Sequence, residues 1–173
     1  MPRAPRRLGL ISDTHGLLRP EALAALAGSD LIVHAGDVGD PAVLDALRAL
    51  APVIAVRGNN DVGAWARRLP ERQTFRFGSH VVRVVHDVAA FRAGAGEGVS
   101  VVMSGHSHRA VIERRAGVLF VNPGSAGPRR FRLPVTIARI DVVASGLRPR
   151  IVTLTPAPAR VSSSPRPAWT ARS

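Results

Sequence analysis

The sequence predicts an α/β fold in which two packed, mixed β-sheets are flanked by helices. Short runs rich in valine, isoleucine and leucine alternate with helix-like segments early in the chain, and hairpin-like runs follow later. Strand–helix alternation favours parallel pairing, whereas hairpins favour antiparallel pairing, so a mixed system accounts for both patterns. With 173 residues and 46% hydrophobic content, the chain can form one compact domain with a substantial core.

The early part of the chain contains three strands and two helices. The strands are predicted at residues 8–12, 31–36 and 52–58, where β-branched and aliphatic residues form short continuous runs. The helices are predicted at residues 20–28 and 41–50. Each helix begins at a proline, which suits the first turn because the N–H that proline lacks would have no intrahelical partner there.

The later part of the chain reads as strands and hairpins. Strands are predicted at residues 80–87 and 99–105, hairpin-like runs at 110–121 and 135–142, and a last strand at 148–154. The folded domain is therefore expected over residues 8–155. We expect residues 1–7 to form a basic, flexible N-terminus and residues 156–173, rich in proline, serine and arginine, to be disordered.

The composition limits the partners and the metal ligands. Cysteine is absent, so any metal ion has to be held by histidine, carboxylate or amide groups. All 24 basic residues are arginine, and six lie in the terminal segments, which leaves 18 basic against 12 acidic residues in the body. This excess suits an anionic substrate. Aromatic residues make up only 4% of the chain, which argues against nucleic-acid binding by base stacking.

The sequence contains no segment that would direct the chain to a membrane. There is no run of 18 apolar residues, and the apolar segment after the basic N-terminus is too short for a signal peptide. We therefore expect a cytoplasmic protein without membrane contact. The oligomeric state stays open and includes a homo-oligomer.

Metal-capable side chains follow five successive predicted strands. They are Asp13, His15, Asp37, Asn59, His86, His106 and His108. Ligands bind at the carboxyl ends of strands in open α/β sheets. In extended backbone, the i, i+2 spacing of Asp13 with His15, and of His106 with His108, places both side chains on one face. The other two histidines, His34 and His80, are expected to be structural or exposed.

The ligand types are suited to two divalent cations. Asp37 is our candidate for a bridge, because a carboxylate has two oxygens and a histidine cannot join two cations. Two carboxylates leave two such cations with a net positive charge, which attracts a phosphate and acidifies water. Each motif is weak alone, and an Asn59-Asn60-Asp61 run is commonly only a turn. Their order, each after an apolar strand, makes the set more specific than its parts.

The set resembles a known family. It includes Asp13-x-His15, Gly36-Asp37, Gly58-Asn59-Asn60-Asp61, His86 and Gly105-His106-Ser107-His108. Over roughly residues 8–155 this pattern resembles the calcineurin-like metallophosphoesterase superfamily. The Asn122-Pro123-Gly124-Ser125 segment makes the chain similar to the small, YfcE-type phosphodiesterase branch.

The resemblance implies a four-layer αββα sandwich of two mixed β-sheets flanked by helices, with a dinuclear site. Asp13, His15, Asp37 and His108 would hold one metal, and Asp37, Asn59, His86 and His106 the other. Two divalent ions are the implied cofactors, with Mn²⁺ expected and Fe, Zn, Ni or Co as alternatives. A metal-bridging hydroxide would hydrolyse a phosphodiester, or a phosphomonoester, of a small-molecule substrate.

Two positions depart from the family pattern. Many members have a histidine that protonates the leaving group where this chain has Asn60, and an amide is a poor acid. Substrates with good leaving groups, or water as the acid, are then expected. Asp87 follows His86 and adds a negative charge that would orient a ligand histidine or repel an anionic substrate.

Substrate contacts are predicted at Arg57, Asn60 and Arg129. Arg57 would reach a phosphate or form an ion pair, with Asp61 as the candidate partner. Arg129 would line the mouth of the site.

Two other functions stay open. One is a non-catalytic, protein-binding scaffold of the same fold, and the other is a nuclease. The complete set of ligand positions favours an enzyme over a scaffold. The absence of a capping domain and of the site histidine argues against a nuclease.

Overall fold

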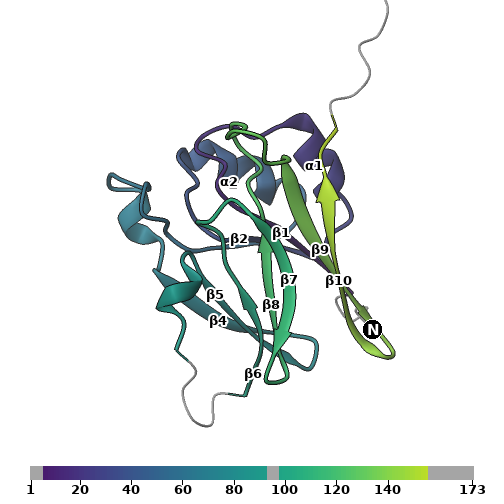
Figure 1. Ribbon diagram of the computed structural model, residues 1–173. Helices are drawn as coiled ribbons and strands as arrows, with labels where there is room; N and C mark the ends of the chain where they lie inside the picture. The colour runs from purple at the N-terminus through teal and green to yellow at the C-terminus, as the bar shows by residue number, and fades with distance from the viewer. Residues whose placement is uncertain (1–5, 93–97, 156–173) are drawn as a thin grey trace, which may run out of the picture.

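The fold consists of two five-stranded β-sheets packed face to face (Figure 1). The computed structural model describes residues 6–92 and 98–155. The first sheet has the order β10-β9-β1-β2-β3 and the second the order β4-β5-β6-β8-β7. The first-sheet strands are β1 Arg7–Ile11, β2 Leu31–His34, β3 Val53–Ala55, β9 Thr136–Val143 and β10 Gly146–Thr153. The second-sheet strands are β4 Arg72–Phe77, β5 His80–Val85, β6 Val99–Met103, β7 Ala110–Arg115 and β8 Val118–Pro123.

Both sheets are mixed, as the sequence predicted. In the first sheet, β1, β2 and β3 are parallel, while β9 is antiparallel to both β1 and β10. In the second sheet, β5, β6 and β8 are parallel, and β4 and β7 are antiparallel edge strands. Each sheet therefore presents the carboxyl ends of several parallel strands, which is where loops that bind ligands are normally found.

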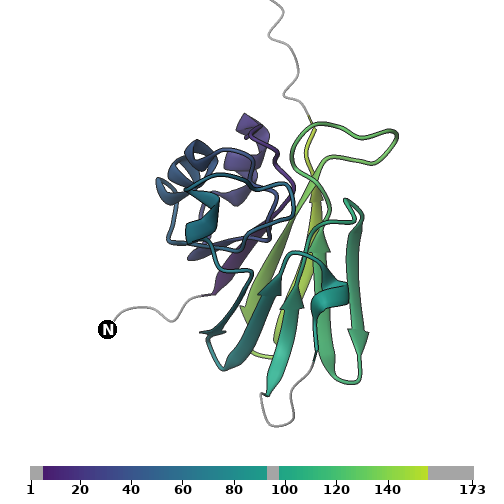
Figure 2. The same ribbon diagram turned by 90° about the vertical axis from the view of Figure 1, so that its left-hand side faces the viewer.

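The helices cover the outer face of the first sheet (Figure 2). Helices α1 Pro20–Leu26 and α2 Pro41–Arg48 place Leu26, Leu44 and Leu47 against that face. A second apolar cluster, which includes Leu10, Val84 and Met103, fills the space between the sheets. The α/β sandwich of two mixed sheets is thus confirmed.

The layer over the second sheet is thin. A 3₁₀ turn, η2 Val88–Ala90, is followed by Phe91, whose ring meets Phe120 of β8 at 5.8 Å between centroids. Another 3₁₀ turn, η1 Ala66–Arg68, lies between β3 and β4. In residues 6–92 and 98–155, the two α-helices are both packed on the first sheet.

Helix α2 follows directly from its sequence. Asp40 is the N-cap, and its carboxylate accepts a hydrogen bond of 2.8 Å from the Ala42 N–H. Pro41 comes next, and Arg48 lies in the last turn, where a positive charge faces the negative end of the helix dipole.

The strand β4 was not predicted from the sequence, and two other strands end before their predicted last residues. β4 alternates exposed and half-buried side chains, so it lacks the continuous apolar run by which we predicted the other strands. β2 ends at His34 and β3 at Ala55, two and three residues before their predicted ends. The remaining residues form the loops that carry the candidate site.

The first strand begins one residue before the predicted start of the domain at residue 8. β1 begins at Arg7, whose guanidinium lies 2.8 Å from the Asp141 carboxylate. The predicted tail of residues 156–173, residues 1–5 and residues 93–97 lie outside the described part of the chain. None of the helices in the described ranges is long and apolar enough to cross a membrane.

Candidate metal centre

The seven predicted ligand residues lie in loops that follow β1, β2, β3, β5 and β6. Three of these strands belong to the first sheet and two to the second. The loops meet, because side chains from both sheets lie within contact distance of one another. His86 after β5, for example, lies 3.5 Å from Asp37 after β2.

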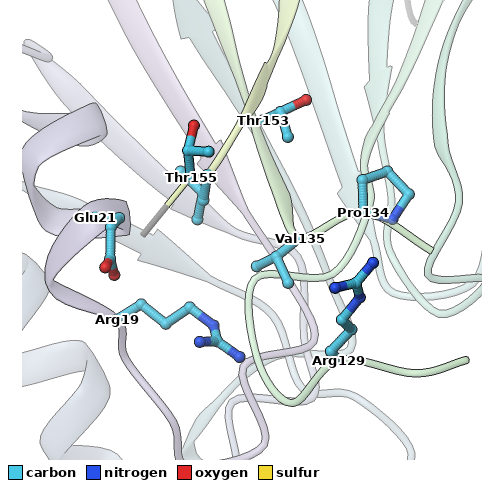
Figure 3. A pocket seen from close by; sticks show the side chains of 8 residues that line it. Arg19, Glu21, Arg129, Pro134, Val135, Thr153 and Thr155 are labelled. Carbon is cyan, nitrogen blue, oxygen red and sulfur yellow. The ribbon is translucent and has the colours of Figure 1, made fainter. Parts of the chain in front are cut away.

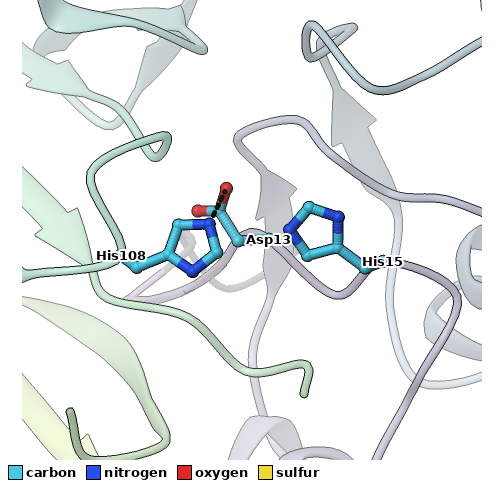
Figure 4. A group of neighbouring side chains, drawn as sticks. All are labelled: Asp13, His15 and His108. Carbon is cyan, nitrogen blue, oxygen red and sulfur yellow. Dashed lines mark ion pairs between the residues drawn. The ribbon is translucent and has the colours of Figure 1, made fainter. Parts of the chain in front are cut away.

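A first group of ligand atoms is formed by Asp13, His15 and His108. One donor atom from each lies within 4.8 Å of the others. The distance from Asp13 Oδ1 to His108 Nε2 is 3.4 Å. The ring centroids of His15 and His108 are 5.4 Å apart. Figure 4 shows the Asp13 side chain between the two rings.

A second group surrounds Asn59. The Asn59 Oδ1 atom lies 3.0 Å from His86 Nε2 and 3.1 Å from His106 Nδ1. Asp37 Oδ1 is 3.5 Å from His86 Nε2. The imidazole rings of His86 and His106 meet edge to face at 5.1 Å.

Asp37 lies between the two groups. Its Oδ1 atom faces His86 of the second group, and its Oδ2 atom is 3.9 Å from His15 Nε2 of the first. Asp13 is close to both groups as well, since its donor atom also lies within 4.8 Å of those of Asp37 and His86. Asp37 therefore contacts histidines of both groups, one with each carboxylate oxygen.

Buried polar atoms in the first group are suited to bind a cation. Among the described residues, Asp13 Oδ1 and His15 Nε2 are buried without a hydrogen-bond partner, and so is Nδ1 of His108, whose Nε2 faces Asp13. Such atoms are costly unless something satisfies them. A set of imidazole nitrogens and carboxylate oxygens suits divalent cations such as Mn²⁺, Fe²⁺ or Zn²⁺. The residues of the site therefore fit the metal ions expected from the sequence.

The surroundings of His86 lead to the same conclusion for the second group. His86 Nδ1 lies 2.8 Å from the Ala35 carbonyl oxygen, which can only accept, so Nδ1 carries a hydrogen. In a neutral ring, Nε2 would then direct a lone pair at the oxygens of Asn59 and Asp37. A cation or a proton between these atoms would satisfy all three.

His86 and Asp37 also shift each other's pKa. Burial lowers the pKa of His86, but the hydrogen bonds to Asp37 and to the Ala35 carbonyl raise it by more, so the pKa lies above its ordinary value. Burial raises the pKa of Asp37, yet hydrogen bonds from His86 and Asn60 lower it well below its usual range. Below pH 6.5 His86 is therefore protonated and forms an ion pair with the Asp37 carboxylate at 3.5 Å.

Burial shifts the pKa values of Asp13 and His108 in opposite directions. It raises the pKa of Asp13, because a buried carboxylate loses its hydration. It lowers the pKa of the His108 imidazole, to which the positive charge of Arg130 also contributes. His108 is thus held in the neutral form that a metal ligand requires.

The backbone presents these side chains differently from the extended geometry that the spacing predicted. Asp13, His15, Asp37, His106 and His108 have φ angles of 55°, 47°, 54°, 67° and 58°. Left-handed backbone costs about 1 kcal/mol or more at each non-glycine residue. Backbone hydrogen bonds such as Asp13 N–H to the Gly36 carbonyl, 3.0 Å, hold the loops in place.

Two glycines allow the loops to approach closely. A Cβ atom on Gly36 would lie 2.5 Å from His86 Nδ1, and φ is 94° there. A Cβ atom on Gly58 would lie 2.2 Å from Asp37 Oδ1. Side chains at these positions would displace the ligands of the second group.

Asp61 and Asn122 support the ligand loops, a role that the sequence analysis did not predict. The Asp61 carboxylate accepts hydrogen bonds of 2.8 Å from the N–H groups of Gly39 and Gly58. The Asn122 amide donates to the Gly105 carbonyl at 2.6 Å, directly before the histidine pair. The signals were present, since Asp61 and Asn122 belong to the motifs that carried the family resemblance.

The three predicted substrate-binding residues do not line one common cavity. Arg57 lines the cavity at the second group, about 440 Å³ in volume, but its guanidinium pairs at 2.5 Å with Glu71 and not with Asp61. Asn60 donates from its side chain to Asp37 Oδ2 at 2.7 Å. Arg129 lines a separate cavity of about 340 Å³, opposite Arg19 (Figure 3).

Asp87 also lines the cavity at the second group. Its carboxylate accepts a hydrogen bond of 2.9 Å from the Ala89 N–H and so caps η2. The His86 ring is oriented by the Ala35 carbonyl instead.

The fold and the site define an α/β sandwich protein with a candidate metal centre of histidine, carboxylate and amide ligands. The chain belongs to the calcineurin-like phosphoesterase superfamily, whose domain pattern matches residues 7–145. It is 37% identical over 132 residues to a probable metallophosphoesterase of Methanocaldococcus jannaschii, covering 68% of this chain and 67% of that protein.

Solved structures share the fold. The YfcE phosphoesterase of E. coli superposes with a TM-score of 0.64 at 23% identity, over 86% of this chain and all of that one. Vacuolar protein sorting 29 of Cryptosporidium parvum gives a TM-score of 0.69 at 15% identity, over 87% of this chain and 98% of that one. The resemblance to the family that the sequence indicated is confirmed.

Proposed function

We propose that the chain is a phosphoesterase that binds two divalent cations, with Mn²⁺ expected, and hydrolyses small phosphodiesters or phosphomonoesters that have good leaving groups. The observation that carries the proposal is the convergence of two groups of candidate ligand atoms: buried Asp13 Oδ1 and His15 Nε2 in the first, and Asn59 Oδ1 facing His86 Nε2 and His106 Nδ1 in the second. Membership of the superfamily supports hydrolysis of a phosphoric ester as the reaction.

Each group would hold one cation. Asp13, His15 and His108 would ligate the first, Asn59, His86 and His106 the second, and Asp37 would bridge them. Bound divalent cations supply positive charge to the phosphoryl oxygens and lower the pKa of water. The chain contributes the orientation of the ligands and a cavity in which a phosphoester fits beside them.

The preference for good leaving groups follows from Asn60. Its side-chain amide donates to Asp37 Oδ2, and an amide cannot give up a proton to a departing alkoxide. Arg57 does not replace it, because a guanidinium stays protonated and here is paired with Glu71. An ester whose leaving group departs as a stable anion needs no such acid.

The test combines metal content with hydrolysis. Metal-free protein is titrated with Mn²⁺ and assayed with bis-p-nitrophenyl phosphate and with p-nitrophenyl phosphate. Two bound ions and Mn²⁺-dependent hydrolysis are expected for the wild type, and loss of hydrolysis for Asp37→Ala and His106→Ala. His80→Ala is the matched control, because His80 begins β5 and lies in neither ligand group.

A protein-binding scaffold is the alternative outcome. If the metal-loaded protein hydrolyses none of a panel of phosphomonoesters and phosphodiesters, the scaffold hypothesis replaces the enzyme hypothesis. If the metal-free protein hydrolyses the esters as fast as the loaded protein, the metal centre is not the site of the reaction.

A further inference from the structure

The buried histidine of β2 has no place in either ligand group. His34 is 0% exposed, and burial lowers the pKa of its imidazole to about 3, so the ring is neutral at physiological pH. A neutral imidazole has one N–H donor and one lone pair. The partners of its two nitrogens decide which is which.

The hydrogen bonds around His34 have one consistent set of directions. The Gly36 N–H can only donate, and it lies 3.2 Å from Nδ1, so Nδ1 is the acceptor. Nε2 therefore carries the hydrogen and donates it to the Thr14 hydroxyl oxygen at 2.9 Å. The Thr14 hydroxyl passes its own hydrogen to the Val38 carbonyl, also at 2.9 Å.

One arm of this chain of hydrogen bonds reaches the first ligand group. Thr14 lies between Asp13 and His15 and is itself 0% exposed. Because its hydroxyl is held from both sides, by His34 and by the Val38 carbonyl, the left-handed turn that carries the two ligands is fixed.

The other arm reaches the second ligand group through a single peptide unit. The Gly36 N–H and the Ala35 carbonyl belong to the same planar peptide and point in opposite directions. The N–H donates to His34, and the carbonyl accepts from His86 Nδ1 at 2.8 Å. Rotation of this peptide would break both contacts, so His34 also determines how the His86 ring is held.

We propose that His34 is a positioning residue that sets the geometry of both ligand groups, through the Thr14 hydroxyl on one side and the Ala35–Gly36 peptide on the other. The inference rests on the proposed function, because it assumes that both groups hold metal. Residues that orient ligands from behind typically change metal affinity by about 10- to 100-fold when they are replaced.

The test separates the two arms by isothermal titration of the metal-free protein with Mn²⁺. His34→Asn places an amide oxygen near the position of Nδ1, so it keeps the acceptor for Gly36 and loses the donor to Thr14. His34→Gln places its amide nitrogen near the position of Nε2 and keeps only the donor. Each variant should lower the affinity for one of the two Mn²⁺ ions about 10-fold. The affinity for the other ion should stay within a few-fold of the wild-type value.

Thr14 provides an independent pair of variants. Thr14→Val has the same shape without the hydroxyl and should reproduce the loss of His34→Asn, but not that of His34→Gln. Thr14→Ser restores a hydroxyl and should recover the wild-type affinity. These variants keep the proposal testable if the His34 variants fail to fold.

The variant Ile32→Val tests whether His34 affects metal binding only by stabilising the fold. Ile32 lies two residues before His34 in β2 and is equally buried, and the loss of one methylene group destabilises the fold without touching the polar chain. Its Mn²⁺ affinities should match the wild type at a temperature well below unfolding.

The proposal is overturned if the folded His34 variants bind two Mn²⁺ ions as tightly as the wild type, or if Ile32→Val weakens binding as much as they do. In either case the wild type still binds Mn²⁺ and hydrolyses phosphoesters, so the proposed function stands. A wild type that binds no Mn²⁺ overturns both proposals.

Discussion

An amide lies against the Asp37 carboxylate at the point where a titratable side chain would be able to supply a proton. Asn60 donates to Asp37 through both its backbone N–H, at 2.9 Å, and its side chain, at 2.7 Å. We predict that Asn60→His increases hydrolysis of esters with alkoxide leaving groups by about 10-fold or more, because a well-placed general acid contributes about 10²- to 10⁴-fold and the new histidine would supply part of this. Esters of p-nitrophenol should change little.

The measurement is kcat against the pKa of the leaving group for a series of phosphoesters. The slope should become shallower for Asn60→His than for the wild type. Asn60→Gln is the control, because it keeps an amide and should leave the slope unchanged. An equal change for aryl and alkyl esters would contradict the prediction.

The protonation of His86 predicts how metal affinity depends on pH. Its pKa in the metal-free fold lies above the ordinary value of 6.5, so the ion pair with Asp37 stabilises the fold fully below that value. This contribution is lost as pH rises through the folded pKa. Metal binding needs the lone pair of Nε2 and has the opposite dependence.

Mn²⁺ affinity should therefore rise with pH and level off once His86 has lost its proton. Titration calorimetry at pH values between about 5.5 and 8.5 measures this rise, and the number of protons released on binding should fall over the same interval. His86→Gln should show a smaller rise. Equal affinity across the interval would contradict a site built from histidines.

At the residue scale, the side chains that meet at the candidate site could be predicted, but not the backbone conformation that holds them. The motifs named the seven candidate ligands because their donor types and order are visible in the sequence. The left-handed turns at Asp13 and Asp37 could not be predicted, because bonds between distant loops impose them. His34 was read as structural or exposed, since its partners are 20 and two residues away.

Among the secondary-structure elements, continuous apolar runs were the reliable signal. The strands that reach the buried space between the sheets, such as β1 and β6, were predicted within one or two residues. β4 was missed because it is an edge strand with an Arg-Gln-Thr-Phe-Arg-Phe sequence. Alternation of Phe75 and Phe77 with polar residues, followed by Gly78-Ser79, was the available hairpin signal.

Helix α2 gives a stability prediction, because its N-cap leads directly from the Asp37 loop. Asp40→Ala removes the acceptor for the Ala42 N–H and should lower the free energy of unfolding by about 1 kcal/mol. Urea denaturation of the metal-free protein measures this. Asp45→Ala on the same helix is the control, since it loses only an exposed pair with Arg48, and a cost equal to that of Asp40→Ala would contradict the capping role.

At the scale of the whole molecule, the candidate ligands come from both sheets. Asp13, Asp37 and Asn59 follow strands of the first sheet, whereas His86 and His106 follow strands of the second. The sequence predicted two mixed sheets, but the strand orders depend on which apolar faces meet, and a single sequence does not give that pairing. The proposed metal centre would connect both halves of the sandwich at one end.

Metal removal should therefore destabilise the entire fold and not only the site. A ligand that binds only the native state adds about 2.7 kcal/mol at 100 times its dissociation constant, and each kcal/mol shifts the Tm of a domain of this size by roughly 2–4 °C. Calorimetry should show a Tm that is roughly 5–10 °C higher with saturating Mn²⁺ than with a chelator. The Tm of Asp37→Ala should respond much less, because this variant lacks the bridging carboxylate. If chelation leaves the wild-type Tm unchanged although Mn²⁺ is measurably bound and removed, the ligands do not join the two sheets energetically.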